Sequence, residues 1–162
     1  MKRIEVKLSL PIVAPLLDVM KTATDTLRQA LAAPLALHDL DAEWRETWTQ
    51  ELLEAQNAEL QAFLGLFDQE FFATGIVSFD EDNAEIILRA CTALRLRLRI
   101  TALQALPDAA LEEGNIDPEQ LSAAQRNAFM CYLFLATIQE LIIKHLDAIL
   151  LGEADEETPA ED

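Results

Sequence analysis

The sequence AFMCYLFLA, residues 128–136, decides the fold class because it contains no charged residue and no helix breaker. It lies in a nearly apolar run from Asn127 to Leu151, within a chain whose formal net charge is −17. Polar residues interrupt the run at Gln139, Glu140, Lys144, His145 and Asp147. The uninterrupted part is shorter than the roughly 20 apolar residues that a membrane-spanning helix needs. We therefore predict the central helix of a protein core, and no membrane span.

Length and composition predict one mainly α domain. A chain of 162 residues matches a single domain, at roughly 100–200 residues per domain, and 51% hydrophobic residues suffice for a sizeable core. Four glycines and six prolines leave little material for a turn-rich β fold. We expect the helical domain to cover residues 1–152. The acidic segment 153–162 has no core-forming residue and is predicted to be disordered.

The charge of the chain bears on its partners. It has 29 acidic and 12 basic residues, and without the last ten residues 23 acidic and 12 basic residues remain, a net charge of −11. Affinity for nucleic acid depends on lysine and arginine displacing counterions from phosphate. An acidic surface predicts neither a nucleic-acid partner nor an anionic membrane.

The two cysteines, Cys91 and Cys131, lie in apolar helical pattern, where a thiol behaves as a small hydrophobic group. No Cys-x-x-Cys spacing is present, so a zinc or redox motif has no support. The first residues lack the apolar core of a signal peptide. We predict a cytoplasmic protein without a metal or cofactor.

Residues 2–8 alternate between charged and apolar side chains, which is typical of a half-buried strand. A strand needs a partner for its backbone groups, and residues 75–79 offer the best candidate. We predict a minor two-stranded β ribbon packed on helices.

Hydrophobic spacings of three and four predict a helical bundle of about four principal helices. They cover residues 10–32, a segment from Asp39 or Asp41 to Phe67 or beyond, residues 80–106, and a last helix after Ser122 to Leu151. The arginine–leucine alternation at 94–100 also fits a strand, and we favour helix. Residues 108–117 are expected to form a loop, and 117–120 a short helical turn.

Four residues are candidate binding residues. Arg95 and Arg99 share a helix face; they either pair with acids on neighbouring helices or, if partly buried, bind an anion or an acidic partner. Trp44 and Trp48 also share a face. They belong either to the core or, together with Tyr132, to a ligand pocket.

A metal site in a helical bundle is typically built from glutamate and histidine three residues apart. The two histidines, His38 and His145, have no glutamate at that position, and Glu140 precedes His145 by five residues. A helical ligand-binding or metal-binding protein, or an enzyme using His145, Glu140 and nearby acids, therefore remains the second hypothesis.

Several segments resemble a bacterial family, the domain-of-unknown-function family 2017. They are DAEWR at 41–45, GIVSFD at 75–80, AEIILRA at 84–90 and LRL at 94–96, within roughly residues 39–100. In actinobacteria such genes tend to lie beside the adaptor of the Clp protease, so the resemblance implies a link to Clp-type proteostasis. It implies no catalytic residues.

Our leading hypothesis is a non-catalytic cytoplasmic protein-interaction or regulatory module, rather than an enzyme, that forms a homodimer. The last helix has more apolar surface than one chain is expected to cover, and obligate interfaces resemble a core cut in half. The predicted interface residues are Phe129, Tyr132, Leu133 and Ile143.

Overall fold

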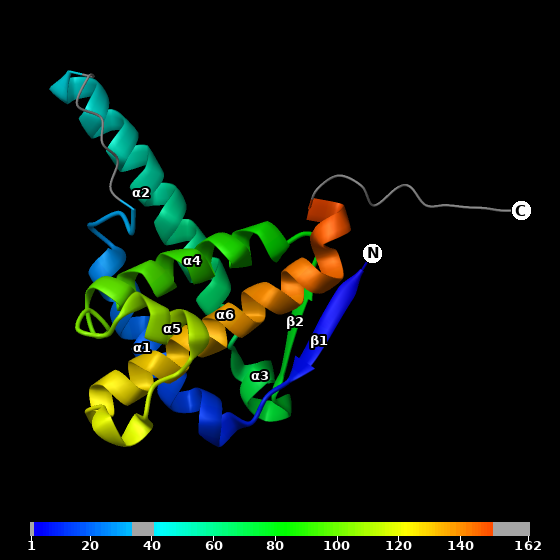
Figure 1. The fold of residues 1–162 in the computed structure, drawn as a ribbon. Helices are drawn as coiled ribbons and strands as arrows, with labels where there is room; N and C mark the ends of the chain where they lie inside the picture. The colour runs from blue at the N-terminus through cyan, green and yellow to red at the C-terminus, as the bar shows by residue number, and fades with distance from the viewer. Residues whose placement is uncertain (1, 34–40, 151–162) are drawn as a thin grey trace, which may run out of the picture.

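Two long helices cross at the centre of the molecule, α4 (Ala84–Ile100) and α6 (Ala123–Leu150), and they make its most extensive contact (Figure 1). The computed structural model describes residues 2–33 and 41–150. In these ranges two further helices are long, α1 (Leu10–Leu27) and α2 (Ala42–Leu64), and both contact α4. The predicted mainly α fold with four principal helices is confirmed.

Helix α6 contributes one face to the core. Its buried side chains recur at spacings of three and four, at Cys131, Leu135, Ile138, Ile142 and Leu146. They contact α4 on one side and α1 on the other. By length and composition alone, residues Ala123–Leu146 are long and apolar enough to cross a membrane. In the structure this helix packs as a core helix, with one face buried against α4 and α1. The absence of a membrane span stays a prediction.

The predicted ribbon is present. Strands β1 (Arg3–Lys7) and β2 (Ile76–Asp80) pair antiparallel, with Ile4 opposite Phe79 and Val6 opposite Val77. Phe79 and Val77 are buried on the helices, while the charged residues of β1 face solvent. Charged and apolar side chains alternate in β1 because one face of the strand meets solvent and the other packs on the helices, as the sequence suggests.

The first two predicted helices end earlier than expected. Helix α1 stops at Leu27 rather than residue 32, because the Gln56 side chain hydrogen-bonds the backbone of the segment that follows. Helix α2 stops at Leu64, and a separate short helix, α3 (Gln69–Thr74), begins where Asp68 accepts a hydrogen bond from the amide of Phe71.

The third predicted helix is shorter at both ends. Asp80 belongs to β2, and its carboxylate accepts hydrogen bonds from the amides of Asp82 and Asn83, so the chain turns before α4 begins. At its other end the helix stops at Ile100. Residues 94–100 are helical, which settles the helix-or-strand ambiguity.

The segment between α4 and α6 is more ordered than predicted. Helix α5 (Asp108–Glu113) occupies part of the expected loop, and the expected helical turn is a 3-10 helix, η1 (Pro118–Gln120). Helix α6 then begins with a capping box: the Ser122 hydroxyl accepts from the amide of Gln125, and the Gln125 side chain accepts from the amide of Ser122.

The N-terminal half of α2 extends away from the rest of the molecule (Figure 1). Every side chain from Ala42 to Leu52 is exposed, whereas Leu60 and Phe63 near the other end are fully buried. Only the C-terminal half of α2 is therefore anchored in the core. We call residues 42–52 the arm.

Candidate functional site

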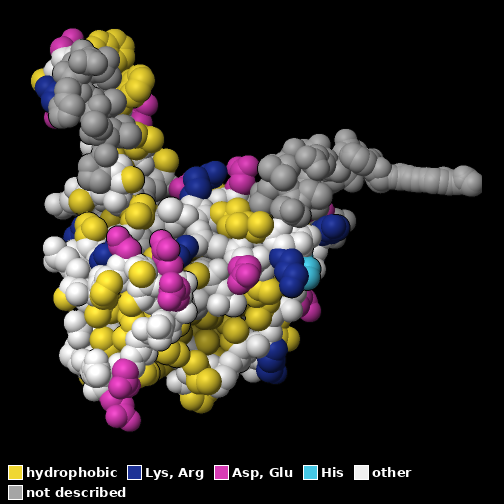
Figure 2. All heavy atoms as spheres, viewed as in Figure 1, with side chains coloured by type: hydrophobic (Ala, Val, Ile, Leu, Met, Phe, Trp, Pro, Cys, Tyr) yellow, Lys and Arg dark blue, Asp and Glu magenta, His cyan; other side chains and the backbone are white. Residues whose placement is uncertain are grey.

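Three large apolar side chains form a stripe along the arm. Trp44, Trp48 and Leu52 are spaced four residues apart, which places them on neighbouring turns of one face. Their exposed fractions are 58%, 47% and 42%. Figure 2 shows hydrophobic side chains along the projecting end of α2. Large aromatic groups left in water are unusual on a closed surface and mark sites of contact with other molecules.

The apolar stripe continues into a groove between α2 and α4. The groove has a volume of about 520 Å³, and Leu52 belongs to both features. Most of the residues that line the groove are apolar. The complete lining consists of Leu31, Ala32, Ala33, Leu52, Ala55, Gln56, Glu59, Leu88, Arg89, Thr92, Ala93 and Leu96. Because the arm leads directly into the groove, the two form one continuous apolar surface, which we call the α2 surface.

The arm also carries a high density of negative charge. Helix α2 contains five glutamates and one arginine, a net charge of −4. Four of these glutamates line a shallow depression with Thr47 and Gln50; they are Glu43, Glu46, Glu51 and Glu54. No salt bridge to these four carboxylates is present within residues 2–33 and 41–150. The arm thus presents an apolar stripe together with carboxylates that form no salt bridge to the described residues.

Three polar side chains, those of Gln56, Glu59 and Arg89, hold the groove in shape. Gln56 donates to the carbonyls of Leu27 and Ala30, both at 3.0 Å, and accepts from the amide of Ala32, also at 3.0 Å. Across the groove, Arg89 of α4 pairs with Glu59 of α2, and this hydrogen bond raises the pKa of the guanidinium. These contacts fix the C-terminal half of α2 against both neighbouring helices.

The comparisons with known proteins identify a family. The family model for the domain of unknown function DUF2017 matches residues 14–146. The chain belongs to the DUF2017 family. The match extends well beyond residues 39–100, which carry the resemblance seen in the sequence, and it includes the whole α2 surface. No curated protein and no solved structure shows significant similarity to the chain.

The predicted arginine pair of this DUF2017 domain is divided between two structural roles. The Arg95 guanidinium lies 4.5 Å from the centre of the Tyr132 ring, and its Nη1 donates to Gln139 at 2.7 Å. Arg99 pairs instead with Asp108 and donates to the carbonyl of Leu103.

Arg95 therefore stabilises the contact between α4 and α6, and Arg99 connects α4 to α5. The Nε of Arg95 is buried and has no hydrogen-bond partner within the part of the chain that the structure describes. Neither arginine lines any of the five most pronounced hollows among the described residues. The arrangement does not bring Arg95 and Arg99 together as one anion site.

The predicted interface residues on α6 are not equally accessible. Phe129 is 5% exposed and belongs to the core of the monomer, because α6 is covered on two sides. Tyr132 and Leu133 are half-buried against that core. Ile143 is 52% exposed. Of the four, Ile143 is thus the residue best placed to contact a second molecule.

Residues 2–33 and 41–150 show no cluster of side chains that fits the metal site of the second hypothesis. Glu140 and His145 are both exposed on α6. Among residues 2–33 and 41–150 no three histidine, cysteine, aspartate or glutamate side chains lie together as a metal site. His38 lies outside the described residues.

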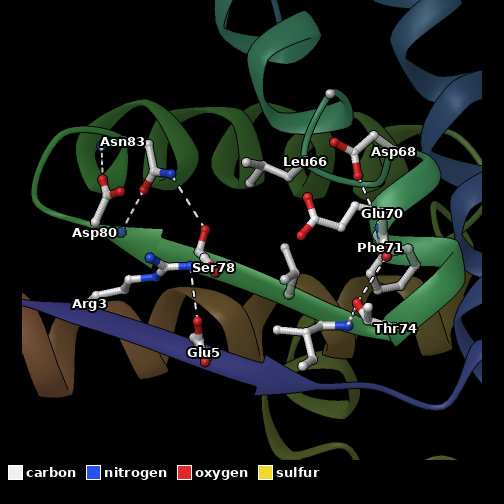
Figure 3. Close-up of a pocket in the computed structure, with 13 residues that line it drawn as sticks. Arg3, Glu5, Leu66, Asp68, Glu70, Phe71, Thr74, Ser78, Asp80 and Asn83 are labelled. Atoms are coloured by element: carbon white, nitrogen blue, oxygen red, sulfur yellow. Dashed lines mark hydrogen bonds and ion pairs between the residues drawn. The ribbon is translucent and has the colours of Figure 1, made fainter.

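A second hollow, of about 430 Å³, lies between the ribbon and α3 (Figure 3). Its polar side chains already serve local structure. Asp68 caps α3, Arg3 pairs with Glu5 and donates to Ser78, and the side chain of Asn83 accepts from the amide of Asp80. We read it as the junction that holds the ribbon to the helices.

Both cysteines lie in the core, as the sequence predicts. Burial raises the pKa of both thiols, to about 12 for Cys131, whose thiol points to the carbonyl of Leu16. A catalytic cysteine needs a lowered pKa and access to substrate. Neither condition is met at Cys91 or Cys131.

The α2 surface contains two of the predicted site residues, Trp44 and Trp48, but not in the ligand pocket considered for them. Tyr132 belongs to α6 and contacts Arg95 instead. No local pattern in the sequence indicates the groove, because its walls come from α2, α4 and the segment 31–33 that follows α1. A partial signal was available: polar residues surround a narrow apolar stripe at 42–52.

Proposed function

We propose that this DUF2017 domain is a non-catalytic protein-binding module whose binding site is the α2 surface. The observation that carries the proposal is the exposed stripe of Trp44, Trp48 and Leu52, continuous with an apolar groove. Tryptophan is the residue type most enriched at the energetic centres of interfaces. A projecting helix with a free apolar face is also a common means of binding another protein.

The buried state of the cysteines supports a non-catalytic role, because it removes the strongest nucleophiles of the chain from solvent. A cytoplasmic location and a link to Clp-type proteostasis are part of the same proposal and derive from the sequence and the family resemblance. Formation of a homodimer through α6, around Ile143, is a separate element of it.

The proposal is tested by photocrosslinking in the native cell. A photoreactive residue at Leu52 should give a discrete crosslinked protein, and the same residue at Ile12 should not. Ile12 is a suitable control because it is 62% exposed on α1 and lies outside the groove. Equal labelling at both positions, or no product at Leu52, would refute a binding role for the α2 surface.

A third crosslinking position tests the homodimer. A photoreactive residue at Ile143 should give a product of twice the mass of the chain. If light scattering of the purified protein at micromolar concentration shows a monomer, the homodimer is refuted while the α2 surface remains a candidate site.

A further inference from the structure

The α2 surface combines apolar side chains with negative charge, and this combination indicates the kind of partner that it binds. Resting on the proposed protein-binding function, we propose that it binds a basic amphipathic helix of another protein. The apolar face of that helix packs on the stripe and the groove, and its lysine or arginine side chains face the glutamates of the arm.

The dimensions of the stripe fit a helix. From Trp44 to Leu52 the α2 axis advances about 12 Å, at 1.5 Å per residue, which is slightly more than two helical turns. Beyond Leu52 the apolar surface continues over Ala55 and across to Leu88 and Leu96 of α4. A helix of three to four turns with apolar residues at spacings of three and four would contact this whole length.

The negative charge next to the stripe lies along one of its two edges. At about 100° per residue around the helix axis, Glu51 lies about 20° from Trp44. Glu43 and Glu54 lie about 80–100° from Trp44 in the same direction, whereas Arg45 lies about 100° away on the other side. A docked helix therefore meets a row of carboxylates along one edge. Positive side chains at that edge favour binding and fix the orientation of the partner.

The same charges disfavour a second copy of the chain as the occupant. Pairing two arms through their stripes would bring two sets of glutamates together, in chains that each carry a net charge of −17. Like charges across an interface rim oppose association. A basic partner neutralises this charge, and its attraction to the arm weakens as salt screens it.

The test uses a defined probe, a helical peptide of about 18 residues with leucines at spacings of three and four and lysines elsewhere. The comparison peptide has glutamate in place of every lysine. Trp44 and Trp48 are the two tryptophans of the chain, so intrinsic fluorescence reports occupancy of the arm directly. The lysine peptide should shift the emission to shorter wavelength and bind at least about tenfold more tightly than the glutamate peptide.

Two matched variants separate local charge from the total charge of the protein. Changing Glu43, Glu46, Glu51 and Glu54 to glutamine should weaken binding of the lysine peptide at least about fivefold, while Leu52→Ala should weaken binding of both peptides. The control variant has glutamine in place of four exposed glutamates elsewhere, which gives the same change in net charge. It should bind the lysine peptide like the wild type. These control positions are Glu112, Glu113, Glu119 and Glu140.

Equal affinity for the two peptides, or an equal effect of the two four-glutamine variants, would overturn the basic-helix proposal. So would self-association that is abolished by Leu52→Ala, since it would identify a second copy as the occupant. In each of these cases the crosslink at Leu52 still decides the proposed function independently.

Discussion

Replacing Gln56 with alanine should destabilise the protein measurably although the residue lies on a half-buried helix face. Its side chain makes three hydrogen bonds to the backbone between Leu27 and Ala32, two as donor and one as acceptor. These bonds satisfy backbone groups at the end of α1 that have no partner in the helix. Alanine removes all three and leaves helix propensity unharmed.

The magnitude follows from these contacts. Each hydrogen bond contributes about 0.5–1.5 kcal/mol net, so three give about 1.5–4.5 kcal/mol. Water can reach part of this site, because Gln56 also lines the groove. We therefore expect a loss of about 2 kcal/mol in the free energy of unfolding, which corresponds to a decrease of roughly 4–8 °C in Tm.

The assay is urea unfolding followed by far-UV circular dichroism, since tryptophan fluorescence of the exposed arm responds weakly to loss of the core. Gln50→Ala is the matched control on the same helix. Its side chain is exposed and makes a single long contact, 3.5 Å, to Glu54, so the loss should stay below about 0.5 kcal/mol.

Gln56→Glu adds a second measurement. The carboxylate cannot donate, and it faces the carbonyls of Leu27 and Ala30, so this variant should be less stable than Gln56→Ala at pH 7. Protonation restores one donor, and the difference between the two variants should shrink near pH 4. The reasoning is refuted if Gln56→Ala is as stable as Gln50→Ala.

The remaining predictions concern the ribbon junction and the buried thiols. Gly75→Ala should cost about 2–3 kcal/mol, because Gly75 has a φ of 75° and a Cβ there would lie 2.9 Å from the carbonyl of Leu8. Gly114→Ala, at a φ of 67° with open space around it, should cost only about 1 kcal/mol by thermal unfolding. Cys91 and Cys131 should react with a thiol reagent only after unfolding. Because burial raises the pKa of both thiols in the folded state, the free energy of unfolding should fall as pH rises above about 8.5, less steeply in a variant with alanine at both positions.

Each of these predictions has a contradicting outcome. Equal melting temperatures for the two glycine variants would show that the approach to Leu8 is not restrictive. Thiols that react equally fast with and without urea would show that the core opens readily. An alkaline loss of stability that is unchanged in the double alanine variant would assign it to other titrating groups.

Periodicity along the chain was sufficient to predict the ribbon and the four long helices, but it did not predict the short helices α3 and α5. The alternation in residues 2–8 found β1, and spacings of three and four found the four long helices. The ends were less predictable, because they depend on contacts distant in sequence. Gln56 ends α1 from 29 residues away, measured to Leu27, and nothing in the sequence near Leu27 indicates this.

Periodicity could not predict which apolar stripes are exposed to solvent. Trp44, Trp48 and Leu52 show the same spacing as the buried residues of α6, and so does Ile12 with its helical neighbours. A stripe is buried only if another element covers it, and coverage depends on where helices cross. For the same reason the sequence analysis assigned Phe129 to an interface, although its side chain is buried in the core of the monomer.

The pairing of Arg3 with Asp80 has a consequence for synthesis of the chain. At about 5–20 residues per second, the ribosome delivers the second strand roughly 4–15 seconds after the first. During that interval the N-terminal strand has both edges open, as in segments prone to aggregate. Its charged residues, Arg3, Glu5 and Lys7, disfavour pairing of an open strand edge with another chain.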